Sequence, residues 1–445
     1  MKPQFKNKDY MLTSLVLIII YFSFISLGLQ DSLLGAAWPS MHNTFNVPLH
    51  FAGIISMIIA AGTVIAATLS VYTIRRFGTG RIMAACVLIT ASALIGFSFS
   101  NSFIYLCLLA VPLGLGGGSV DVALNNYVAL HYKARHMNWL HCFWGVGASI
   151  GPLIMSSFLL YRNSWNLGYR TIGFFQLGVV VLLFLSISLW KKNPTDENTA
   201  KNNPVKFSKI FKISGVKEIL LSFFCYCTFE SITGLWGASY LVTERGISPQ
   251  TAAKWISLFF IGITAGRFLS GFITIKLSNR KMIRMGQIVV GCGIIVLILP
   301  FGNITLLPGL FLIGLGCAPI FPAMVHETPE NFGRENSQAI IGIQMGCAYI
   351  GTSIMPPIFG WLASCTSFKI YPLFIGIALI VKIILVEIVN IKVEKARMEP
   401  GTHHECQKGF FPASAHGRAG SPNAAPAQKE KKDGKKEDSI DKLLL

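Results

Sequence analysis

The sequence is poor in charged residues. Asp, Glu, Lys and Arg make up only 13% of the 445 residues, whereas hydrophobic residues make up 52%. A soluble domain carries about a quarter charged residues, and it could not cover so much apolar surface without aggregating. The shortage of charge therefore excludes an ordinary soluble protein. The charged residues stand in short gaps between long apolar runs, which is typical of a membrane protein.

Motifs for several other chemistries are missing as well. The sequence contains no G-x-x-x-x-G-K-[ST] segment for ATP and no H-E-x-x-H segment for zinc. Its ten cysteines show no zinc-binding spacing. We therefore expect no metal, no cofactor and no enzymatic activity. The net charge of +18 does not indicate a nucleic-acid partner, because Lys and Arg lie at the ends of apolar runs and in the C-terminal tail.

Apolar runs of about 20 residues predict twelve transmembrane helices, since lipid leaves the backbone no other hydrogen-bond partners. They cover roughly residues 10–35, 49–73, 82–100, 103–130, 139–161, 169–190, 216–241, 251–275, 282–301, 304–326, 337–362 and 369–390. We expect an all-α membrane protein with an N-terminal six-helix bundle at 1–190, a cytoplasmic linker at 191–215, a C-terminal six-helix bundle at 216–390 and a disordered basic tail at 391–445.

The distribution of basic residues predicts the orientation. The loops on one side of the predicted spans carry 20 Lys and Arg, and the loops on the other side carry five. Basic residues concentrate on the cytoplasmic side of a membrane. We therefore expect both termini in the cytoplasm and a multi-pass, monomeric protein in the lipid bilayer of the plasma membrane.

The two halves of the chain resemble one another. Residues 111–118 (VPLGLGGG) align with residues 311–318 (FLIGLGCA) at an offset of 200. Arg76 aligns with Lys276 at the same offset, and Asp31 aligns with Glu230 at an offset of 199. A duplication that keeps the direction of the spans predicts a parallel repeat.

Three acids lie inside the predicted spans: Asp31, Asp121 and Glu230. An ionisable group at the bilayer centre costs at least ~2.5 kcal/mol, so each acid is a candidate for function. Asp121 shares a helical face with Gly114 and Asn125, and small residues there let another helix approach. We expect Asp121 to face a cavity and exchange a proton; the alternative is a structural acid bonded to a neighbouring helix.

Asp31 and Glu230 are candidates for contact with a solute, and Asp31 also for proton coupling. Trp38 and Trp236 follow them, and a carboxylate beside an aromatic ring suits a polyol. The alternatives are a partly hydrated acid at the mouth of the first span and a helix-packing role for Glu230. Further candidates for solute contact are Gln30, Asn125, Asn126, Trp144 and Gln344; for the last two, a gate or a packing role is the alternative.

Three further basic residues lie within spans. Arg267 stands near the middle of the eighth span, where we expect it to pair with Glu230 or another acid. His141, near the cytoplasmic end of the fifth span, is a candidate for a gate, and packing is its alternative. Lys382 in the twelfth span is expected to extend its amine to the membrane interface.

The loop after the second span resembles the loop motif of the major facilitator superfamily. Arg76 and Gly78 match the R-x-G core of that motif, while Arg75 stands where the family has Asp. The resemblance extends over residues 10–390. It implies two six-helix halves that rock around a site at the membrane midplane, with a gate that includes Arg76, Gly78 and, in the second half, Lys276.

Within the superfamily the chain most resembles the fucose:proton symporter group and its sugar-transporter-like relatives. Residues 116–125 read GGGSVDVALN where that group has G-x-G-x-x-E-T-A-A-N. The resemblance implies that Asp121 is the proton-binding acid and Asn125 the amide beside it. It also implies that Asp31 takes part in substrate recognition and coupling.

Together these patterns predict a secondary active transporter of a small polar solute, a sugar, which works by proton symport and alternating access. Two rival interpretations stay open. An efflux carrier that exchanges protons for amphipathic molecules would need a more apolar lining. A non-transporting membrane sensor with a carrier fold would tolerate neutralisation of all three acids.

Overall fold

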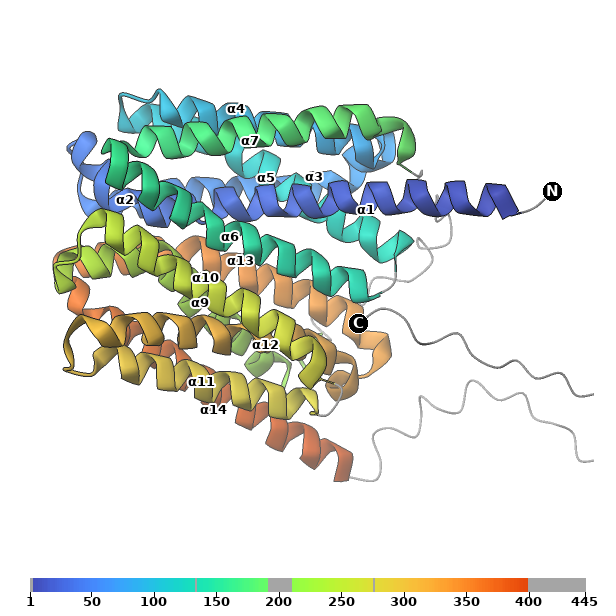
Figure 1. The fold of residues 1–445 in the computed structure, drawn as a ribbon. Coiled ribbons are helices and arrows are strands. Elements are labelled where there is room, and N and C mark those ends of the chain that lie inside the picture. The colour runs from blue at the N-terminus through green and yellow to red at the C-terminus, as the bar shows by residue number, and fades with distance from the viewer. Residues whose placement is uncertain (1–2, 133, 191–209, 275–276, 399–445) are drawn as a thin grey trace, which may run out of the picture. The chain divides into compact units, whose positions relative to one another are not determined.

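The computed structural model describes residues 3–132, 134–190, 210–274 and 277–398, and Figure 1 shows the bundle of long helices that they form. Most of the predicted linker, Lys276 and the tail from residue 399 lie outside the described residues. The elements are α1 (Pro3–Asp31), α2 (Leu33–Thr44), η1 (Leu49–Phe51), α3 (Ala52–Phe77), α4 (Thr79–Ser98), α5 (Phe103–His131), α6 (Ala134–Arg162), α7 (Trp165–Ser186), η2 (Ile187–Leu189), α9 (Val216–Arg245), α10 (Pro249–Ile273), α11 (Asn279–Ile298), η4 (Gly302–Thr305), α12 (Leu306–Phe332), α13 (Arg334–Cys365), η5 (Phe368–Ile370) and α14 (Tyr371–Met398).

Within the described residues, 12 helical segments are long and apolar enough to cross a membrane. This number confirms the twelve predicted spans. The first segment combines α1 and α2 (Ser14–Thr44), and the last extends to Met398, eight residues beyond the predicted end. The helices α1–α7 form the first half of the bundle and α9–α14 the second. An even number of crossings brings the start of α1 and the end of α14 to one side, which we call the terminal side (Figure 1); the other is the distal side.

The first span is longer than predicted and is interrupted in its middle. The helix α1 ends at Asp31 and α2 begins at Leu33. The hydroxyl of Ser32, between them, donates to the carbonyls of Gly28 at 3.2 Å and Leu29 at 3.3 Å. A serine hydroxyl that bonds a preceding carbonyl bends a helix. Inside a membrane, such an interruption is tolerated where protein or a water-filled cavity surrounds it, and here it places an acid at the break.

The predicted repeat is visible in the helix packing. A methyl group added at Gly114 of α5 would touch the carbonyl of Ile59 in α3. A methyl group added at Gly314 of α12 would touch the carbonyl of Phe259 in α10. Gly314 and Phe259 stand 200 residues after Gly114 and Ile59, so the same pair of positions makes this contact in each half. The small residues therefore serve the close helix approach that the sequence predicted, and they do so twice.

Contacts between the two halves include close packing on the distal side. There, Gly35 of α2 lies against Gly234 of α9, and Gly53 of α3 lies against Pro357 of α13. The hydroxyl of Ser156 in α6 donates to a backbone carbonyl of α10 at 2.7 Å. Because two helix pairs meet at backbone distance and a third pair is joined by a hydrogen bond, the halves are tightly joined at this end.

Ion pairs connect the second half near its terminal side. Arg280 of α11 contacts Glu327 of α12 at 2.9 Å and Glu394 of α14 at 2.6 Å. Arg284 donates two hydrogen bonds to the carboxylate of Glu387 in α14. Single exposed ion pairs contribute little to stability, but this group joins three helices. It therefore holds the start of α11 against the C-terminal parts of α12 and α14.

Lys382 does not reach the membrane interface, so the expectation for this residue was wrong. Its side chain has no accessible surface, and within the described part of the chain its amine has no hydrogen-bond partner. It interacts electrostatically with Cys225 of α9 and Cys317 of α12. The reason is tertiary: α14 packs closely on α9, and Lys382 lies in that contact near Cys225.

Candidate solute and proton site

Asp31 and Trp144 form a direct contact between α1 and α6. The indole Nε1–H of Trp144 donates to Oδ2 of Asp31 at 2.9 Å. Asp31 lies near the middle of the first span, yet its side chain is accessible. A hydrogen bond to a carboxylate is about twice as strong as one between neutral groups. Trp144 therefore fixes the orientation of an acid that a solute can still reach.

Asp121 lies on α5 with its predicted neighbour Asn125. The amide Nδ2 of Asn125 donates to Oδ1 of Asp121 at 2.9 Å and to its backbone carbonyl at the same distance. Asp121 also interacts electrostatically with Tyr349 of α13, in the other half. Both side chains of the α5 pair are partly accessible. This acid thus stands at the interface of the halves and is not enclosed within one helix bundle.

The acids Asp31 and Asp121 are close enough to interact electrostatically. Like charges in a medium of low polarity repel strongly. Such a pair is stabilised when one member takes up a proton. The two predicted proton-coupling residues are therefore brought together, on two different helices of the first half.

Arg267 of α10 connects this acidic pair to the second half. Its guanidinium carbon lies 5.1 Å from the centre of the Trp144 ring, a cation–π contact. Its Nη1 donates to the backbone carbonyl of His141 in α6 at 3.3 Å. Arg267 also interacts electrostatically with Glu230 of α9. The predicted pairing with Glu230 is thus electrostatic, and the direct contacts of Arg267 are to α6.

The repeated acid Glu230 faces the same region from the second half. It lies in the middle of the seventh span and is partly accessible. Tyr226 lies beside it, and the hydroxyl of Tyr226 donates to the backbone carbonyl of Cys317 at 3.2 Å. The two repeated acids therefore differ in their surroundings: Asp31 is bonded to an indole, and Glu230 lies beside a phenol and a guanidinium.

Gln30 belongs to a buried polar network, and its side chain also hydrogen-bonds the neighbouring Asp31. Its Oε1 accepts a hydrogen bond from Nε2 of Gln176 in α7 at 3.0 Å. Gln176 also donates to the carbonyl of Ser26 at 3.2 Å and accepts from Thr90 of α4 at 3.0 Å. This network joins α1, α4 and α7. It anchors the helix that carries Asp31 one residue later.

The structure places Trp38 and Trp236 away from Asp31 and Glu230. Both side chains have no accessible surface. The indole of Trp38 donates to the carbonyl of Leu49, and that of Trp236 to the carbonyl of Pro356 at 2.8 Å. They form core contacts on the distal side in both halves, because a buried indole N–H needs a partner.

The other candidates occupy varied positions. Asn126 is exposed at the side of α5, next to the site. Gln344 is fully buried in α13 and accepts a hydrogen bond from Thr328 of α12 at 3.1 Å. The ring of His141 packs edge-on against Phe24, 5.9 Å between centroids. Of these three, only Asn126 offers polar atoms that a solute could reach freely.

The loop between α3 and α4 has the backbone that its motif suggests. Gly78 adopts φ +83°, a conformation that side chains disfavour. Arg76 is exposed, and its guanidinium lies 5.4 Å from the centre of the Phe77 ring. The tight turn is therefore present, and the gating role of Arg76 and Gly78 stays a prediction.

Two residues of this region had not been singled out from the sequence. Gln176 is a lone amide in the predicted sixth span, a signal that could have been used because polar residues in spans are uncommon. Tyr349 of α13 gives no such signal, since tyrosines are common in membrane helices. Its proximity to Asp121 follows only from how the halves meet.

Comparison with known proteins supports the architecture. The Major Facilitator Superfamily description matches the chain twice, over residues 20–218 and 219–415. The chain is 25% identical to the glucose/mannose transporter GlcP of Bacillus subtilis (strain 168), covering 85% of this chain and 94% of that protein. It is also 25% identical to the cis,cis-muconate transport protein of Acinetobacter baylyi (strain ATCC 33305 / BD413 / ADP1), covering 78% and 87%.

A solved structure shows the same fold. It is a bacterial homologue of the human lysosomal transporter Spinster in an inward-facing and occupied conformation, with a TM-score of 0.65 and 14% identity over 88% of this chain and 99% of that one. The two family matches divide the chain where the sequence repeat does. The chain therefore belongs to the Major Facilitator Superfamily and is a multi-pass membrane transporter, not an enzyme.

Proposed function

We propose that this transporter moves a small polar solute of the sugar class into the cell by proton symport. The single observation that carries the proposal is the accessible acid pair of Asp31 and Asp121, which Trp144 and Arg267 connect to the second half. A polyol needs hydrogen-bond acceptors and an apolar ring face. Carboxylate, amide and indole groups supply both here.

The acid pair supports proton coupling through its own repulsion. When both carboxylates are charged, each opposes the other, and a proton on Asp121 removes that cost. When Asp121 is protonated, the Asp31 carboxylate remains free to accept hydrogen bonds from solute hydroxyl groups while it keeps the hydrogen bond from the indole. Solute and proton would then bind together more readily than either alone, which is the requirement for symport.

Arg267 supports a coupling of this chemistry to movement of the halves. It belongs to α10, but its direct contacts are to α6, so rocking of one half against the other must change them. Because the distal side is tightly joined, we infer that the site faces the terminal side here. Taken with the excess of Lys and Arg in the loops of that side, this corresponds to the cytoplasm and the plasma membrane.

GlcP, named as a glucose/mannose transporter, supports a sugar as the solute, whereas the cis,cis-muconate transport protein carries a dicarboxylate by name. The accessible acids favour a neutral polyol over an anion, which they would repel. An apolar efflux substrate would leave them unpaired, at a cost in desolvation. One experiment can therefore test the direction of transport, the class of solute and the coupling ion together.

The test measures the external pH of lightly buffered vesicles while single sugars are added. We expect one sugar to alkalise the medium with the wild type and with Glu244→Gln, a distal control whose carboxylate accepts a hydrogen bond from Ser367 at 2.9 Å. Asp121→Asn should abolish the signal while solute exchange continues. Silence across the panel, or an unchanged signal in Asp121→Asn, would overturn sugar–proton symport through this residue.

A further inference from the structure

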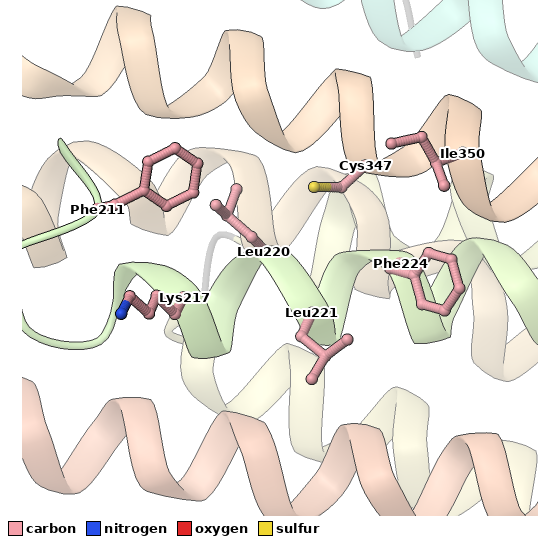
Figure 2. A pocket seen from close by; sticks show the side chains of 7 residues that line it. All are labelled: Phe211, Lys217, Leu220, Leu221, Phe224, Cys347 and Ile350. Atoms are coloured by element: carbon pink, nitrogen blue, oxygen red, sulfur yellow. The ribbon is translucent and has the colours of Figure 1, made fainter. Parts of the chain in front are cut away.

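A groove that the transport site does not use lies between the start of α9 and the middle of α13 (Figure 2). Its volume is about 350 Å³, within the range of about 300–1,000 Å³ of small-molecule sites. The lining is apolar except for one amine and consists of Phe211, Lys217, Leu220, Leu221, Phe224, Cys347 and Ile350. Such a lining cannot satisfy the hydroxyl groups of a polyol.

The groove opens to the outside of the protein. Leu221 is 48% exposed and Ile350 is 51% exposed. On α13 the exposed row continues from Ile350 to Ile354 and Ile358, each four residues further and thus on one helix face. An exposed apolar row of this length on a membrane-spanning helix is a surface that acyl chains can cover. The groove is therefore an indentation next to an apolar outer row of α13.

The same face of α13 leaves extra room toward the terminal side. Gly346 and Gly342 precede Ile350 by four and eight residues, and a methyl group added at either would meet nothing within 4 Å. Side chains at these positions would narrow the approach to the groove. Their absence lets an elongated apolar chain run along α13.

The amine marks one end of the groove. Lys217 is the second residue of the span Val216–Arg245, and a lysine at the end of a span can extend its amine to lipid headgroups. Phe224 lies seven residues later, about 10 Å further along the helix axis. Figure 2 shows the nitrogen of Lys217 at the end opposite Phe224. An apolar channel with a cation at its headgroup end complements an acyl chain that carries a negative head.

Lys217 forms no direct ion pair with Glu218, the acid that follows it in the sequence. Glu218 forms its ion pair with Lys392 of α14, at 2.6 Å, and interacts with Lys217 only electrostatically. Lys212 is exposed five residues before Lys217 and adds positive charge on the same side. Each basic residue near an anionic bilayer surface attracts it.

We propose that this groove, named the α9–α13 groove, binds one acyl chain of an anionic phospholipid whose phosphate pairs with Lys217. Its lining contains none of the residues of the candidate solute site, so the proposal does not depend on the identity of the solute. Its occupant would span the contact of α9 with α13, the two helices of the second half that meet the first half at Gly234 and Pro357.

The experiment uses the purified full-length protein and native mass spectrometry with phosphatidylglycerol or phosphatidylcholine of identical acyl chains. We expect the wild type to retain one phosphatidylglycerol and to bind phosphatidylcholine more weakly. Lys217→Gln should weaken the phosphatidylglycerol about five-fold, the loss expected for one headgroup contact, and bring the two lipids to similar affinity. Lys254→Gln, at an exposed distal lysine, should change neither.

Filling the groove tests the acyl chain separately. Leu221→Trp from α9 and Ile350→Trp from α13 should each reduce retention of both lipids, and a lipid with a photoreactive acyl chain should cross-link to peptides of α9 and α13 in the wild type only. Equal binding of the two lipids by the wild type would overturn the role of Lys217. Cross-links elsewhere, or retention unchanged in both tryptophan variants, would overturn the groove as the site.

Discussion

Packing of Gly35 against α9 gives the sharpest prediction about how this transporter changes shape. A methyl group at Gly35 would touch the carbonyl of Gly234 and would lie 3.0 Å from Cα and 3.1 Å from O of Leu235. These are backbone atoms, which no rotamer change can move aside. Gly35→Ala should therefore push α2 away from α9 and disfavour the arrangement with a closed distal side.

The expected size follows from overpacking, which costs about 1–3 kcal/mol when a well-packed site receives extra methyl groups. Replacing glycine by alanine in a helix also gains up to ~1 kcal/mol of propensity, but this gain applies to both arrangements and cancels. The population with an open distal side should rise roughly five- to 150-fold, since 1.4 kcal/mol is a factor of ten.

The assay is labelling of Ser156→Cys, in a background without native cysteines, by an impermeant maleimide added on the distal side. Ser156 is buried at the contact of α6 with α10, so its labelling rate reports opening. The matched control is Gly271→Ala on α10, where an added methyl group meets nothing within 4 Å. Equal labelling rates in Gly35→Ala and the control, with both proteins folded, would refute the reasoning.

Two further predictions concern polar contacts inside the bundle. Trp144→Phe keeps an aromatic ring but removes the hydrogen bond to Asp31, a bond to a charged group that is worth about 1.5–3 kcal/mol. The kcat/KM for uptake of the identified solute should therefore fall roughly ten- to a hundred-fold. Trp139→Phe is the control on the same helix; its ring packs on other aromatic residues, and kcat/KM should change little. Wild-type uptake by Trp144→Phe would show that the bond does not position the acid. Gln176→Leu breaks the amide contacts that join α1, α4 and α7 and should lower the free energy of unfolding by about 1–3 kcal/mol. Gln287→Leu is the control: it replaces a buried amide whose Nε2 has no partner among the described residues, so it should not destabilise the protein. The measurement is thermal unfolding of both variants in detergent. Equal unfolding midpoints for Gln176→Leu and Gln287→Leu would contradict the importance of the network.

The sequence was sufficient for the class of fold. Apolar runs of span length can only be helices in lipid, so their number and approximate bounds were predictable. The repeat was predictable too, because the glycines needed for close helix packing, Gly114 and Gly314, recur at the same offset in the sequence. The break at Ser32 was not, since a serine within an apolar run reads as an ordinary helix residue.

The candidate site was predictable in part. Acids inside spans can be recognised from the sequence because a charged group in the bilayer costs free energy. The structure shows that these residues lie near one another or at the interface of the halves: Asp31, Asp121, Glu230 and Arg267. The tryptophans were assigned by spacing along one helix, and this placed Trp38 and Trp236 wrongly beside the acids. Spacing within a helix cannot tell which neighbour covers a given face.

What the sequence determined by itself is the set of groups that the membrane makes costly: the acids, the internal arginine and the twelve apolar spans that carry them. Only the tertiary structure decided their partners. Trp144 rather than Trp38 holds Asp31, Lys382 is enclosed where α14 packs on α9, and Arg267 contacts the opposite half. The physical reason is that burial and hydrogen bonding depend on atoms from helices distant in the sequence, whereas the preference for lipid is a property of each segment alone.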